Sequence, residues 1–129
     1  MLSPSKQVVS GLSVFVVEDE ALVALNLEDM LDELGCRIIG PAMRMDKAEQ
    51  MIDGEFAADV AILDVNIGGQ KVFPLASKLI ERGVPVVFAT GYGQAGLPED
   101  FHHLPILQKP YTIEDVASGL ESAVNRGQA

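Results

Sequence analysis

Four groups of reactive side chains are spaced along the sequence, and each follows a short hydrophobic run. Three consecutive acids at 18–20 follow the first run, and Asp64 follows a later one. Thr90 and Lys109 come after two further runs. If the runs are parallel strands, the residues that follow them meet at the sheet edge where ligand sites of open α/β folds form. The sequence therefore predicts a site of carboxylates, one hydroxyl and one ammonium group.

Such a set of side chains suits phosphoryl chemistry with a hard cation. Converging carboxylates resist joint ionisation unless a cation lies among them, and oxygen-only ligands favour Mg²⁺ (or Mn²⁺). The Lys109 ammonium can bind one phosphoryl oxygen, and the Thr90 hydroxyl can donate a hydrogen bond to another. A carboxylate can also carry the phosphoryl group covalently. Asp64 is the best candidate for this role, because the acids at 18–20 would flank it.

Short strands and longer helical patterns alternate along the chain. Strands are predicted at 12–17, 37–40, 60–63, 85–89 and 105–107, and helices at 20–34, 46–53, 73–82 and 112–125. This alternation is typical of an α/β fold with a parallel sheet. The stretch 91–104 holds three glycines and a proline. It therefore predicts a short or broken helix where a regular one is expected.

Length and charge limit the classes of function. The 129 residues suit one domain, which we expect at 12–125 with a lead at 1–11 and a frayed tail at 126–129. The net charge of −10 disfavours direct binding to nucleic acid or to an anionic membrane. Apolar stretches of about six residues are too short to span a membrane, and the N-terminus lacks a secretory signal. These observations predict a cytoplasmic protein.

Four motifs at the ends of the predicted strands resemble the receiver domain of two-component response regulators. They are Val-Val-Glu-Asp-Glu at 16–20, Ile-Leu-Asp-Val-Asn at 62–66, Phe-Ala-Thr-Gly-Tyr at 88–92 and Gln-Lys-Pro-Tyr at 108–111. Each motif is weak alone, but the four in this order are specific. The resemblance implies a flavodoxin-like, doubly wound sheet of five parallel strands in the order 2-1-3-4-5 with five helices. The third motif resembles a subgroup of alphaproteobacterial single-domain receivers whose fourth helix is short or degraded.

The resemblance also implies roles for the acidic residues. Asp64 matches the aspartate that accepts the phosphoryl group. Glu18 and Asp19 match the acidic pair that holds Mg²⁺ (or Mn²⁺) together with Asp64. The backbone carbonyl of Asn66 matches a further protein ligand of the metal.

Further positions match the residues that bind the phosphoryl group and the residues that change conformation when it is bound. Thr90 and Lys109 match the switch hydroxyl and the lysine of the family, and the bond from Lys109 to Pro110 is expected to be cis. Many receivers carry an aromatic switch residue where this chain has Ile106. Tyr92 is therefore expected to take over part of the switch.

The expected function is that of a stand-alone signalling module, not of an enzyme acting on other substrates. The module accepts a phosphoryl group on Asp64 from a histidine kinase or a histidine phosphotransfer protein. The resulting switch controls binding of an unknown downstream protein or onward relay, in a monomer or weak homodimer. Two alternatives stay open: a pseudo-receiver that binds without phosphorylation, and a small Mg²⁺-dependent phosphohydrolase. The phosphohydrolase is less favoured because Asn66 replaces the second acid of an Asp-x-Asp pair.

Leu22 and Leu25 fall outside the hydrophobic stripe of the first predicted helix. They predict a docking patch for the phosphoryl donor, close to the acidic residues. The alternatives are contact with the last helix or scattered surface apolar residues, which are common.

Overall fold

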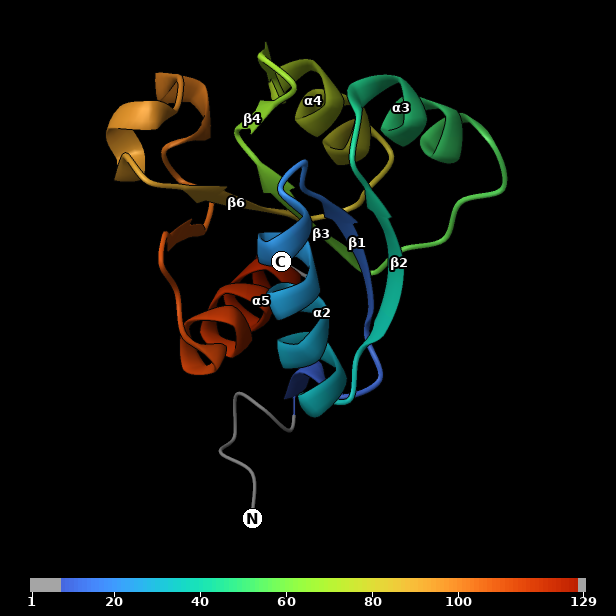
Figure 1. Ribbon diagram of the computed structural model, residues 1–129, viewed down its shortest axis with the longest axis vertical. Coiled ribbons are helices and arrows are strands. Elements are labelled where there is room, and N and C mark those ends of the chain that lie inside the picture. Colours follow the sequence, from blue (N-terminus) through green and yellow to red (C-terminus); the bar gives the residue numbers. More distant parts are fainter. Residues whose placement is uncertain (1–7, 128–129) are drawn as a thin grey trace.

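A five-stranded parallel sheet with helices on both faces forms the centre of the protein (Figure 1). The computed structural model describes residues 8–127. The strands of the sheet are β1 (Ser13–Val17), β2 (Arg37–Ala42), β3 (Val60–Asp64), β6 (Val86–Thr90) and β7 (Ile106–Gln108). The helices are α2 (Ala21–Glu33), α3 (Met45–Asp53), α4 (Phe73–Glu81) and α5 (Ile113–Gly127). The spatial order β2-β1-β3-β6-β7 is the predicted order 2-1-3-4-5, so the flavodoxin-like prediction is confirmed.

The core consists of two hydrophobic layers, one on each face of the sheet. Side chains alternate along β3, so Leu63 packs with α3 and α4 while Ile62 packs with α2 and α5. Strands β3 and β6 are buried along their whole length, which explains their almost continuous hydrophobic sequence. Since β3 is the central strand, Asp64 at its end lies in the middle of the carboxyl edge.

The crossover from β6 to β7 has no α-helix. Four α-helices follow β1 in the described residues, so the predicted number of five is wrong. Two 3₁₀ helices, η1 (Gly93–Gly96) and η2 (Glu99–Phe101), stand in place of the fourth, as the glycines and the proline of this stretch predicted. Phe101 anchors the segment, with its ring 5.8 Å from that of Phe73 and 5.4 Å from that of Phe88.

Strand β2 is two residues longer than predicted. It continues past Gly40 to Ala42 through a cis Gly40–Pro41 bond. Gly40 has φ +97°, and a Cβ there would lie 2.9 Å from the carbonyl oxygen of Val16. The register against β1 shifts between Phe15 and Val17. Glycine is therefore needed where the strand passes close to its neighbour, a contact that no local pattern reveals.

The predicted lead and tail lie partly outside the described residues. Within the lead, Val9 is fully buried in the layer of α2 and α5, and its carbonyl accepts a hydrogen bond from the Cys36 thiol at 3.3 Å. At the other end, α5 continues to Gly127. Between residues 8 and 127, none of the helices combines the length and apolar character needed to cross a membrane.

Candidate functional site

The carboxyl ends of β1, β3, β6 and β7 form one acidic pocket. Its volume is about 260 Å³, and it is lined by Asp19, Glu20, Asp64, Val65, Asn66, Thr90, Gly91, Tyr92 and Lys109. Asp64 and Thr90 are buried, with 8% and 4% of their surfaces exposed. Glu18 is still more buried, at 2%. The predicted site residues from four separate segments therefore meet at one edge of the sheet.

Lys109 joins two of the buried carboxylates. Its Nζ lies 3.1 Å from Asp64 Oδ2 and 3.2 Å from Glu18 Oε1. Burial by itself lowers the pKa of Lys109, but the charges of Asp64 and Glu18 outweigh burial and raise the pKa above its ordinary value. The backbone N–H of Lys109 donates to the Thr90 carbonyl at 2.9 Å, and the Lys109–Pro110 bond is cis as expected. A charged ammonium group is thus fixed beside Asp64.

Glu18 lies deepest in the acidic group. Burial is the main cause that raises the pKa of Glu18 to about 7, and a hydrogen bond with Asp64 raises it further. The backbone N–H of Glu20 opposes this shift by donating to Glu18 Oε2 at 3.1 Å. One ammonium group therefore does not fully compensate the carboxylates packed here, and a further cation would be stabilising.

The acidic residues fit a divalent metal ion. Glu18, Asp19, Glu20 and Asp64 each offer a carboxylate oxygen, and these four atoms lie within 4.8 Å of one another. Oxygen ligands at such spacing are those that Mg²⁺ binds. Glu20 is a fourth candidate ligand that the motif resemblance did not assign. Asn66 lines the pocket, while a ligand role for its carbonyl stays a prediction.

The loop after β6 packs tightly around the predicted switch hydroxyl. The backbone N–H of Tyr92 donates to Thr90 Oγ1 at 3.1 Å, and Gln108 Nε2 donates to the Gly91 carbonyl at 2.8 Å. A Cβ at Gly96 would lie 3.0 Å from Thr90 Oγ1. The 3₁₀ segment therefore rests on Thr90, a contact that no pattern in the sequence indicates. The Tyr92 side chain is 75% exposed.

Comparison with known proteins decides the family. No family model matches the chain. The transcriptional regulatory protein PdtaR of Mycobacterium tuberculosis is 32% identical over 117 residues, which are 88% of this chain and 57% of PdtaR. The phyllosphere-induced regulator PhyR of Methylorubrum extorquens is 30% identical over 120 residues, 86% of this chain and 43% of PhyR. The chain thus spans about half the length of these curated relatives.

A solved structure matches over nearly its whole length. SdrG from Sphingomonas melonis is 37% identical with a TM-score of 0.78, covering 90% of this chain and 98% of SdrG. This chain belongs to the receiver domains of response regulators. The BeF3-activated conformation of SdrG also matches, with 40% identity and a TM-score of 0.73. The narrower subgroup suggested by Phe-Ala-Thr-Gly-Tyr stays a prediction.

A small hairpin that was not predicted covers one side of the receiver pocket. It consists of β4 (Asn66–Ile67) and β5 (Gln70–Lys71), joined by Gly68 and Gly69 with φ +57° and +83°. The Gly68 N–H donates to Asp19 Oδ2 at 2.8 Å. Two adjacent glycines between short strands are a known hairpin signal, so this element was accessible from the sequence.

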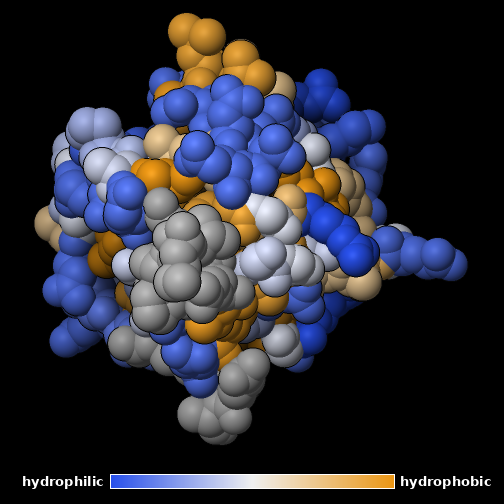
Figure 2. Space-filling view, turned by 90° about the horizontal axis from the view of Figure 1, so that it is seen from below, coloured by the Kyte–Doolittle hydropathy of each residue, from blue (hydrophilic) through white to orange (hydrophobic). Residues whose placement is uncertain are grey.

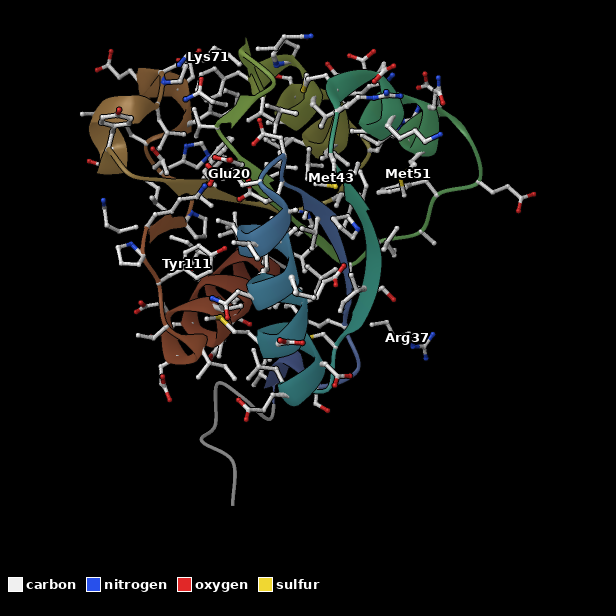
Figure 3. All side chains as sticks on the ribbon, in the orientation of Figure 1. Glu20, Arg37, Met43, Met51, Lys71 and Tyr111 are labelled. Atoms are coloured by element: carbon white, nitrogen blue, oxygen red, sulfur yellow. The ribbon has the colours of Figure 1, made fainter. Side chains whose placement is uncertain are left out.

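Leu22 and Leu25 are exposed on α2, at 81% and 54%. Figure 2 shows one face of the molecule, on which hydrophobic atoms lie among hydrophilic ones and some protrude at the upper rim. Leu22 lines a groove of about 370 Å³ together with Val23, Asn26, Lys109, Pro110 and Tyr111. Tyr111 lies beside α2 in Figure 3. The exposure of Leu22 argues against the alternative that it packs on α5, and the groove connects it to Lys109.

Proposed function

We propose that this receiver is a switch phosphorylated on Asp64 by a phosphohistidine, in a Mg²⁺-dependent reaction. The observation that carries the proposal is the Lys109 ammonium fixed 3.1 Å from a buried Asp64 carboxylate, beside three further acids. A nucleophile, a cation for the phosphoryl oxygens and a set of metal ligands therefore share one pocket. A cytoplasmic location fits this role.

Transfer of the phosphoryl group forms one bond to phosphorus and breaks another. An Asp64 oxygen bonds to the phosphorus atom, the bond from phosphorus to the donor imidazole nitrogen breaks, and its electron pair stays on that nitrogen. Lys109 and the Thr90 hydroxyl bind phosphoryl oxygens of the product. A bound Mg²⁺, held by Glu18, Asp19 and Asp64, would neutralise charge on the phosphoryl group. Movement of Lys109 and Thr90 then shifts the equilibrium of the loops after β3 and β6.

Intact-protein mass spectrometry tests this function. The protein is incubated with Mg²⁺ and acetyl phosphate, with Asp64→Asn and a magnesium-free sample in parallel. We expect the mass of one phosphoryl group in the wild type only. If the wild type gains nothing from acetyl phosphate or from a phosphorylated histidine kinase, the protein is a pseudo-receiver and the proposal fails.

The groove beside Leu22 supports a docking site for the donor. Its exposed leucine and its shared wall with Lys109 would bring an apolar face of the kinase or phosphotransfer protein close to the acidic pocket. Leu22→Glu and Leu25→Glu should slow transfer from the protein donor and leave acetyl phosphate labelling unchanged. Ile80→Glu, on the opposite layer, is the matched control. Equal protein-donor rates in all four proteins would exclude docking here.

A further inference from the structure

The hairpin β4–β5 brings a second lysine to the rim of the acidic pocket. Two glycines with positive φ form its turn and set the register Ile67↔Gln70 and Asn66↔Lys71. Directly opposed residues of an antiparallel pair have side chains on the same face. The backbone therefore places Lys71 beside Asn66, and Figure 3 shows Lys71 near the top of the view, above Glu20.

This hairpin is tied to the pocket at its tip and at its base. At the tip, the Gly68 N–H donates to Asp19 Oδ2 at 2.8 Å. At the base, the Val72 N–H donates to the Val65 carbonyl at 2.9 Å. Lys71 is thus held on an ordered element next to the phosphorylation site.

Lys71 fixes the orientation of the Asn66 side chain. Its Nζ donates to Asn66 Oδ1 at 2.8 Å. An ammonium group is only a donor, so the amide atom that it contacts must be the oxygen. The Asn66 NH₂ group remains as a donor, and Asn66 lines the acidic pocket two residues after Asp64.

We propose that Lys71 is a positioning residue that prolongs the phosphorylated state by holding the Asn66 amide. This inference rests on the proposed phosphorylation of Asp64. In hydrolysis, the oxygen of water bonds to phosphorus and the bond from phosphorus to Asp64 breaks. The electron pair returns to the carboxylate, and both protons of the water leave with the inorganic phosphate as H₂PO₄⁻. With its oxygen held by Lys71, Asn66 presents N–H donors to the phosphoryl group and does not orient the attacking water.

Removal of the Lys71 ammonium should therefore shorten the phosphorylated lifetime. We expect Lys71→Met to accelerate loss of the phosphoryl group about three- to tenfold, the range of one hydrogen bond. Lys71→Arg keeps a donor and should restore a lifetime close to that of the wild type. Lys47→Met is the matched control, because it makes the same change of charge at an exposed position on α3.

The experiment labels each protein with acetyl phosphate and Mg²⁺, removes the donor by rapid desalting and follows intact mass with time. Asn66→Ala and the Asn66→Ala, Lys71→Met double variant are measured in parallel. Because Lys71 acts through Asn66, Lys71→Met should have no further effect in the Asn66→Ala background. In metal-free protein, NMR should show faster hydrogen exchange of the Asn66 NH₂ group in Lys71→Met, a readout independent of phosphorylation.

Failure of this inference differs from failure of the proposed function. If the wild type is not labelled by any donor, the phosphorylation of Asp64 is refuted. If it is labelled and Lys71→Met has an unchanged or longer lifetime, the role of Lys71 is refuted. An equal acceleration by Lys71→Met in the Asn66→Ala background would also overturn it, because Lys71 would then act without Asn66.

Discussion

The Tyr111 hydroxyl is expected to destabilise the fold. Among the described residues, it is the buried side-chain polar atom without a hydrogen-bond partner. Burial is the main cause that raises the pKa of Tyr111 to about 12, and the charge of Glu18 adds to it. The phenol therefore stays protonated, and its O–H group has left water without gaining an acceptor. Such a group costs about 1–3 kcal/mol.

Tyr111→Phe removes this group and keeps the ring, which packs against the layer of α2 and α5. We expect the free energy of unfolding to rise by about 1 kcal/mol or more, which corresponds to about 3–5 °C in Tm for a domain of this size. Urea unfolding followed by circular dichroism measures the change, and the m-value should stay constant.

Tyr92→Phe is the matched control, because the Tyr92 side chain is 75% exposed. Its effect should stay within about 0.5 kcal/mol. A loss of stability in Tyr111→Phe would contradict an unsatisfied hydroxyl at this position. It would mean that the hydroxyl finds an acceptor in solution, for example the Glu18 carboxylate, whose charge contributes to the raised pKa of Tyr111.

Three further variants test the pocket and its supports. The pKa of Glu18 is raised from 4.5 to about 7, so the metal-free folded state binds more protons than the unfolded state in that window. The free energy of unfolding should therefore fall by up to about 3 kcal/mol as pH rises from 4.5 to about 7. Urea unfolding of Glu18→Gln should show no such dependence on pH. Gly96→Ala places a Cβ 3.0 Å from Thr90 Oγ1. It should destabilise by about 1 kcal/mol and slow labelling by acetyl phosphate, and unchanged values of both would contradict the contact. Thr112 and Asp115 form a reciprocal cap on α5, with hydrogen bonds of 2.9 and 3.1 Å. Thr112→Ala should cost about 1 kcal/mol in thermal unfolding.

Local patterns in the sequence were sufficient for the parallel sheet and for most of the pocket. Hydrophobic runs alternate with helical stripes, and parallel strands all end at one edge of the sheet. Asp64, Thr90 and Lys109 each follow such a run, so their convergence followed from the order of elements alone. The break in the fourth helix could also be predicted from local sequence, because glycine and proline disfavour a helix whatever the rest of the chain does.

Features that depend on contacts between residues far apart in the sequence are visible only in the folded protein. Strand β2 can pass close to the backbone of Val16 only because residue 40 is a glycine. The Lys109 ammonium pairs with Glu18 across 91 positions of the chain, and that pairing in a buried pocket sets the electrostatics of the site. The Gly68 N–H reaches Asp19 across 49 positions. The main elements and the edge where the site forms could be predicted from the sequence, because both follow from short-range periodicity and from the order of the elements. Burial, pairing and pKa were decided by packing, because each depends on how closely separate elements approach one another.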